Sequence, residues 1–153
     1  FQMSVLIGNR LCTHAGVGND FLKSVGFWKM DSADESIISD YLNDLFHYKP
    51  NEFTFDGSYD RNNTGVIPSY YGDDDWQSPI WIRPKSLQRV NKKTDLKKNY
   101  IQIVGHTQQD HIDIKGKTTG GKYYYIDTLP SGEYLIDVDG EFEIGYATIV
   151  KYI

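Results

Sequence analysis

Two histidines occupy comparable places in this sequence, each directly after a short apolar run and close to a glycine. His14 follows Leu11–Thr13, and His106 follows Tyr100–Val104 and Gly105. Such runs predict buried strands, and a glycine lets the chain turn sharply where a strand ends. A neutral imidazole held rigidly at a strand end is well suited to binding a metal ion. On spacing alone, a packed or hydrogen-bonded role for each histidine stays open as the simpler alternative.

The composition is that of one globular domain. The chain has 153 residues, of which 39% are hydrophobic and 24% charged, and its net charge is -5. An acidic chain is a poor general nucleic-acid binder, because neutralising phosphates requires a basic surface. No apolar run approaches the ~20 residues of a membrane span. The single cysteine, Cys12, excludes an intrachain disulfide and is compatible with the cytoplasmic location that we expect.

One long helix and one long loop are predicted in the first half. Apolar residues recur three and four positions apart over Ala33–Tyr48, which is typical of an amphipathic helix. Ser32 and Glu35 fit a capping box at its start, and Pro50 ends it. The segment Asn51–Pro79 is rich in turn signals and aromatic residues, so we expect an ordered loop packed against the body of the protein.

Strand signals dominate the rest of the chain. Met3–Ile7 and Leu11–Thr13 are predicted to pair antiparallel across Gly8-Asn9. Five further strands are predicted at 100–104, 111–114, 122–126, 134–138 and 141–149. We expect the strand at 122–126 to pair antiparallel with that at 134–138 in a half-buried sheet. The expected fold class is therefore α/β in the broad sense, α+β, with two sheets flanked by helices.

Four short motifs resemble those of one enzyme family, the calcineurin-like metallophosphoesterases. Val104–Thr107 resembles the family's C-terminal Gly-His-Thr signature. Cys12–Val17 resembles the preceding motif, an apolar strand that ends in His and small residues. Pro79–Pro84, which contains Trp81-Ile82-Arg83, resembles the Trp-x-Arg segment of bacterial and phage-type members. Tyr125–Thr128, with Gly132 and Leu135-Ile136 after it, resembles the strand pair that usually follows Gly-His. The four motifs stand in the family's order and span nearly the whole chain.

The resemblance implies a metal-dependent phosphoesterase of the Ser/Thr protein phosphatase-like branch, built as a four-layer α/β/β/α sandwich. It implies two bridged divalent metal ions, Mn, Fe or Zn, with His14 and His106 both binding one of them. Arg83 would grip the substrate phosphate through a forked pair of hydrogen bonds. Two metals about 3.5–4 Å apart can generate hydroxide and clamp a phosphoryl group. The expected substrate is a phosphorylated protein or small molecule.

Three motifs of the family's first half are not in this sequence: Asp-x-His, Gly-Asp-x-x-Asp-Arg and Gly-Asn-His. In the family they supply the other metal ligands and the catalytic acid. We therefore interpret residues 1–153 as the β-rich C-terminal portion of a single metallophosphoesterase domain, which starts on Phe1 because it is truncated or processed. Such a portion should bind metal weakly and be inactive alone. It should also expose apolar surface or an edge strand around Met3–Thr13, where the missing half docks or the chain self-associates.

Other interpretations stay open. A dinucleoside polyphosphate hydrolase would share the same motifs. A non-enzymatic β-rich interaction domain would use the acidic aromatic segment Tyr70–Trp76 as its contact surface. The acidic run Asp73–Asp75 is more simply a solvated turn than a cation site. His111, with Asp110 and Asp113, could form an outer shell around the metal ligands or a metal patch, but these residues more simply decorate a strand edge. Asp127 more simply makes a structural hydrogen bond at a strand end than acts in catalysis.

Overall fold

The computed structural model describes residues 1–27, 34–55, 74–93, 101–115 and 122–147. The predicted strand residues beyond 147, the loop residues 56–73 and the predicted cap Ser32 lie outside these ranges. In chain order the elements are β1 Ser4–Ile7, β2 Arg10–Thr13, α1 Asn19–Ser24, α2 Glu35–Tyr48, the 3-10 turn η1 Pro50–Phe53, α3 Pro84–Lys93, β3 Ile101–Val104, β4 Asp113–Lys115, β5 Lys122–Tyr125, β6 Glu133–Val138 and β7 Glu141–Tyr146. This is an α+β protein, which confirms the coarse fold class.

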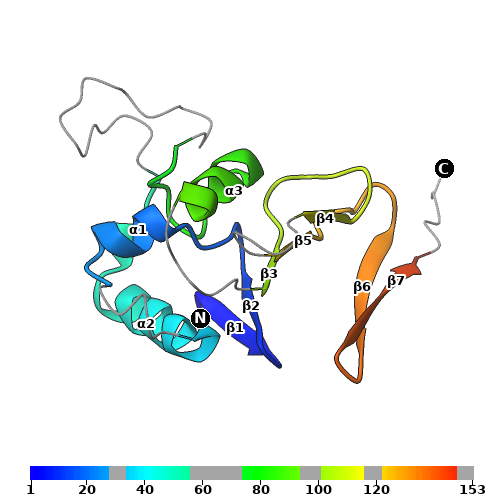
Figure 1. Cartoon of the computed structure of the whole chain (residues 1–153), viewed down its shortest axis with the longest axis horizontal. Helices are drawn as coiled ribbons and strands as arrows, with labels where there is room; N and C mark the ends of the chain where they lie inside the picture. The colour runs from blue at the N-terminus through cyan, green and yellow to red at the C-terminus, as the bar shows by residue number, and fades with distance from the viewer. Residues whose placement is uncertain (28–33, 56–73, 94–100, 116–121, 148–153) are drawn as a thin grey trace.

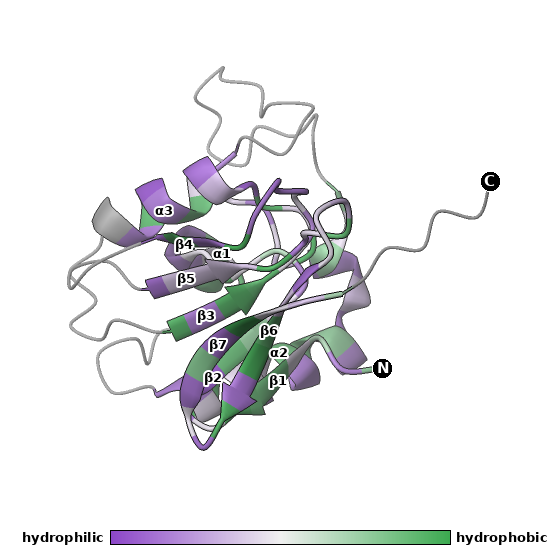
Figure 2. Ribbon diagram, turned by 90° about the vertical axis from the view of Figure 1, so that its right-hand side faces the viewer, coloured by the Kyte–Doolittle hydropathy of each residue, from purple (hydrophilic) through white to green (hydrophobic). Residues whose placement is uncertain are grey.

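A mixed five-stranded sheet with the order β1-β2-β3-β5-β4 forms the centre of the fold. The three inner strands β2, β3 and β5 are parallel, and the two edge strands run antiparallel to them. Thr13, Val104 and Tyr125 form one rung at the carboxyl ends of the parallel strands. The residues that follow these three therefore emerge side by side at one edge of the sheet. Figure 2 shows β3, in the middle of the sheet, as a mostly hydrophobic strand.

The three helices lie on one side of this sheet and the β6–β7 hairpin on the other (Figure 1). One buried cluster joins α1 and α2 to the β1–β2 hairpin and includes Met3, Leu11, Phe21, Leu22 and Leu42. A second cluster joins α3 to β3 and β5 and includes Leu87, Val90, Val104, Tyr123 and Tyr125. The second cluster contains Tyr123 and Tyr125, alternate residues of β5, as a sheet requires when each face packs against a different partner.

Helix α2 begins one residue after Asp34, and the predicted capping box is wrong. The Asp34 carboxylate accepts hydrogen bonds from the backbone N–H groups of Ser36 (3.0 Å) and Ile37 (3.1 Å). Asp is as good a cap as Ser, and it stands closer to the first apolar turn. Glu35 is consequently the first residue of the helix rather than the third after its cap.

The antiparallel hairpin predicted for the first two strands is confirmed, with Gly8 in a left-handed conformation at its turn (φ 60°). Strand β1 lies at the edge of the sheet, and its outward side chains Val5 and Ile7 are 46% and 43% exposed. The expected edge strand with exposed apolar surface is therefore present. Among the described helices, none has the length and apolarity needed to cross a bilayer.

The predicted pairing of the fifth and sixth strands is wrong. Strand β5 pairs in parallel with β3, and β6 pairs with β7 in a separate hairpin. The hairpin packs across the second face of the main sheet, where Phe142 contacts the Tyr124 ring (centroids 4.7 Å apart). The Arg10 guanidinium lies 4.2 Å from the centre of the Phe142 ring and pairs with Asp137 at 3.4 Å. Aromatic and cation–π contacts thus hold the hairpin on the sheet.

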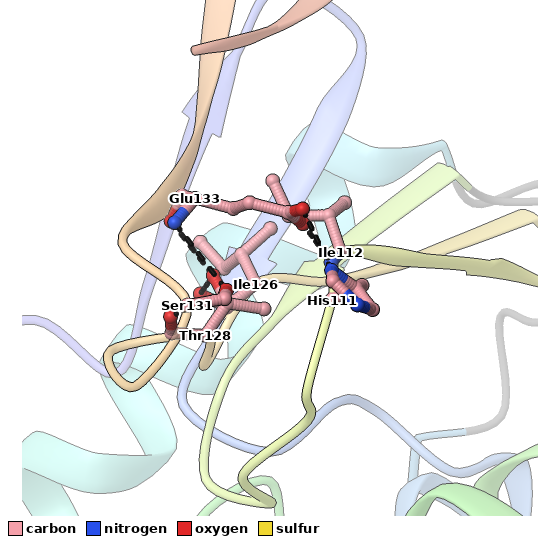
Figure 3. Close-up of polar contacts among 6 residues, drawn as sticks. All are labelled: His111, Ile112, Ile126, Thr128, Ser131 and Glu133. Carbon is pink, nitrogen blue, oxygen red and sulfur yellow. Dashed lines mark hydrogen bonds and ion pairs between the residues drawn. The ribbon is translucent and has the colours of Figure 1, made fainter. Parts of the chain in front are cut away.

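Glu133, the first residue of β6, connects the base of the β6–β7 hairpin to His111 and Ile112, the two residues before β4 (Figure 3). Its carboxylate accepts a hydrogen bond from the Ile112 N–H (2.7 Å) and contacts His111 Nδ1 at 2.8 Å. Its carbonyl accepts the Thr128 hydroxyl (2.7 Å). His111 therefore makes a structural contact, as the simpler interpretation of the sequence held. The backbone hydrogen bond from Ile112, followed by that from His111, lowers the pKa of the Glu133 carboxyl below its usual value.

Replacing Glu133 by Gln should remove a pH-dependent part of the stability. Because the folded state lowers this pKa, the ionised carboxylate stabilises the fold above its unfolded pKa, and the contribution is lost as pH falls through the folded pKa. The thermal midpoint of the wild type should therefore fall more than that of Glu133→Gln between about pH 7 and about pH 3. Melting curves followed by circular dichroism test this. Parallel pH dependences for both proteins would contradict it.

Candidate metal and phosphate site at the carboxyl edge of the sheet

His14 and His106 meet at the edge where β2 and β3 end. His14 Nε2 lies 2.9 Å from His106 Nδ1, although the residues are 92 positions apart in the chain. The backbone ladder continues to this point, because the Gly105 N–H donates to the His14 carbonyl at 2.8 Å. One ring must donate and the other accept at this distance, so the two imidazoles share a proton. The sequence thus predicted correctly that these two side chains lie together.

His106 has a backbone conformation that few residues other than glycine adopt. Its φ is 66°, in the left-handed region. For a residue with a Cβ this conformation costs about 1–2 kcal/mol. The turn after Gly105 aims the imidazole back toward His14 instead of letting it continue along β3. Backbone strain of this kind is often found at functional sites, where the surrounding structure holds a residue in an unfavourable conformation that its function requires.

The surroundings of His106 favour its neutral form. Partial burial is the main cause of its lowered pKa, and the electrostatic effects of His14 and Arg83 lower it further. The carboxylate of Asp127, which follows β5, acts in the opposite direction. His14 itself is exposed. A neutral imidazole offers the lone pair that a metal ion requires.

A third segment brings Arg83 to the same edge. The Pro79 carbonyl accepts the Ala15 N–H at 2.6 Å, which fastens this segment beside the end of β2. Trp81 places its indole edge-on to the His106 ring, with centroids 5.9 Å apart. Arg83 donates a hydrogen bond from its guanidinium to Thr107 Oγ1 at 3.2 Å, next to His106. The site residues predicted from the sequence, His14, Arg83 and His106, therefore gather at one place.

Side-chain amides hold the backbone that leaves His14. Gln102, in the middle of β3, accepts the Val17 N–H (2.7 Å) and donates to the Val17 carbonyl (3.2 Å). Asn91 in α3 also donates to the Val17 carbonyl (3.2 Å) and accepts the Asn19 N–H (3.0 Å). Sequence reasoning did not assign a role to Gln102. A polar residue within an otherwise apolar buried strand was the signal that could have revealed it.

The other predicted candidates, including Asp127 at the same edge, make structural contacts or lie outside the described residues. Asp127 acts structurally through its carbonyl, which accepts the Gln109 N–H at 2.8 Å. In the acidic run, Asp75 is bound by the guanidinium of Arg89, so it is not simply solvated. Residues 70–73 of the acidic aromatic segment lie outside the described residues, and the contact-surface hypothesis stays a prediction.

The two imidazoles fit part of one metal's ligand set. Two nitrogens that each lie about 2.0–2.1 Å from one metal ion are about 3.0–3.4 Å apart, close to the 2.9 Å observed between His14 and His106. Across the described ranges, no three His, Cys, Asp or Glu side chains form a group that could hold a metal ion. Within the described residues, this pair could therefore offer at most two ligands, and the other coordination positions would have to come from other groups.

Comparison with known proteins gives no matching family model, curated protein or solved structure.

Proposed function

We propose that this chain is the C-terminal portion of a two-metal phosphoesterase that hydrolyses phosphomonoesters of proteins or small molecules. The observation that carries the proposal is the 2.9 Å approach of His14 Nε2 and His106 Nδ1 at adjoining parallel strand ends. The proposal includes a four-layer sandwich, in which the helices, the main sheet and the β6–β7 hairpin are completed by an N-terminal portion of the same domain.

Each residue of the site has a distinct part in this proposal. His14 and His106 would hold one divalent ion, Mn, Fe or Zn, which supplies Lewis acidity and an activated water when bound. Arg83 binds the non-bridging oxygens of the phosphate, because a guanidinium matches them through two parallel N–H groups. Thr107 orients Arg83 by accepting one of its N–H groups (3.2 Å). Trp81 packs against the His106 ring and shields that side of it from water.

Metal binding by the chain alone tests the ligand assignment. We expect calorimetry with Zn²⁺ to find one weak site that requires both imidazoles, with affinity reduced at least about tenfold in His14→Ala and in His106→Gly. Glycine is chosen at 106 because it relieves the left-handed strain (φ 66°), so lost binding cannot be ascribed to unfolding. His47→Ala is the matched control, since His47 is exposed on α2 and contacts Tyr48.

Catalysis is tested on the chain together with the N-terminal portion that supplies the other ligands. Hydrolysis of para-nitrophenyl phosphate with Mn²⁺ should fall about 100-fold or more in Arg83→Ala and in His106→Gly. Unchanged turnover in both variants would contradict the proposed function. Zinc affinity that is equally reduced by His47→Ala would contradict the ligand assignment.

A further inference from the structure

A pocket of about 500 Å³ lies beside the histidine pair and shares two residues with the phosphate site. Arg83 and Thr107 belong to both, whereas neither histidine lines the pocket. The first turn of α3, the loop after β3 and strand β4 form its walls. This volume falls within the range of small-molecule sites, about 300–1,000 Å³. The pocket therefore continues outward from the position proposed for the reacting phosphate.

The lining of this pocket is cationic on a chain that is acidic overall. Arg83, Lys85 and Lys115 line it against one carboxylate, that of Asp113, so positive charges exceed negative ones by two. Asp113 pairs with Lys115 at 2.9 Å and orients that ammonium group. The whole chain has a net charge of -5. A local excess of positive charge in a concave site on an acidic protein favours an anionic ligand there.

We propose that this pocket receives the leaving-group side of the substrate and selects small-molecule phosphoesters that carry a second phosphate. The proposal rests on the proposed function, because it places the reacting phosphate on Arg83. Lys85 and Lys115 then bind the second phosphate as compact point charges with several rotatable donors. Gln88 keeps the wall of the pocket in place by donating to the Tyr125 hydroxyl at 3.1 Å. Gln109 does the same on the loop by donating to the Thr107 carbonyl at 3.1 Å.

Binding of inorganic pyrophosphate and orthophosphate to the full chain, with a chelator and no added metal, tests the proposal. Calorimetry in about 0.15 M salt limits the contribution of exposed charges. We expect pyrophosphate to bind at least about tenfold more tightly than orthophosphate. The double variant Lys85→Ala/Lys115→Ala should lose at least about tenfold in pyrophosphate affinity and less than about threefold in orthophosphate affinity.

The charge-matched control is Lys23→Ala/Lys49→Ala, which removes two exposed lysines in the helical half of the chain. This control should keep the wild-type pyrophosphate affinity. Equal affinities for the two probes, or equal losses in the two double variants, would overturn the pocket assignment. Zinc binding by the histidines is measured separately, so its failure would be recognised as failure of the proposed function alone.

Discussion

Gly16→Ala is expected to lower the free energy of unfolding by about 2–6 kcal/mol, through backbone strain of ~1–3 kcal/mol and overpacking of ~1–3 kcal/mol. Gly16 has a φ of 105°, a conformation that residues with a Cβ rarely adopt. A Cβ there would lie 2.3 Å from Leu87 Cδ2 and 3.2 Å from Val104 Cγ1. Leu87 and Val104 are fully buried, so neither side chain has free space into which it can move.

Two other glycines separate the causes of this effect. Gly140 has a similar φ of 92° with open space around it, so Gly140→Ala measures strain alone. Gly18 has no positive φ, but a Cβ there would lie 3.0 Å from Ile82 Cδ1, so Gly18→Ala measures crowding, with the loss of a glycine N-cap of α1, in the absence of left-handed strain. Chemical denaturation followed by fluorescence gives all three values. A loss for Gly16→Ala no larger than that for Gly140→Ala would show that α3 does not pack against this loop as described.

The same substitution should also weaken zinc binding, because Gly16 lies two residues after His14. A loop displaced from α3 moves the His14 ring out of line with His106. A 2.9 Å approach between two ring nitrogens tolerates little displacement.

Gln102→Leu is expected to cost about 1–3 kcal/mol of stability, because it removes the acceptor of a buried N–H group. That group belongs to Val17, which is 3% exposed, and no water can readily replace the lost bond. The Val17 carbonyl keeps its hydrogen bond from Asn91, so the cost comes mainly from the N–H. Leucine has nearly the volume of glutamine and leaves the strand otherwise well packed.

Gln109→Leu is the control for this measurement. Gln109 is half-buried, and its side chain donates to the carbonyl of Thr107, a half-buried residue whose hydrogen bond solvent can replace. Its loss should cost less than about 1 kcal/mol. Urea denaturation of both variants compares them directly, and equal losses would mean that Gln102 has no special part in holding the loop.

Local sequence patterns predicted the parts of this fold that depend on neighbouring residues. Glycines at turns and apolar runs placed the first hairpin and the ends of β2 and β3, because strand formation and its termination are encoded within a few residues. The convergence of His14 and His106 could also be predicted, since the carboxyl ends of parallel strands meet at one edge.

Features set by distant partners could not be predicted in this way. Strand β5 pairs with β3 and not with β6, the next strand in the chain. Strand pairing depends on which strand faces are buried in the folded protein, and the local sequence does not determine this. The cap of α2 is Asp34 rather than Ser32, and the sequence could not decide between them because both residue types cap helices equally well. The cationic pocket joins Lys85 and Lys115, which are 30 positions apart, and no local motif connects them.

The hydrogen bonds that Gln102 and Asn91 make to the Val17 backbone allow assembly of the site to be followed in the protein itself. Amides in loops usually exchange with solvent deuterium quickly, because local opening exposes them. The Val17 amide is bonded to a side chain of the central strand, so its proton is released only when β3 separates from the loop. In a deuterium-exchange spectrum, one slowly exchanging loop amide would therefore report that the His14 segment is in place, whether or not any metal ion is bound.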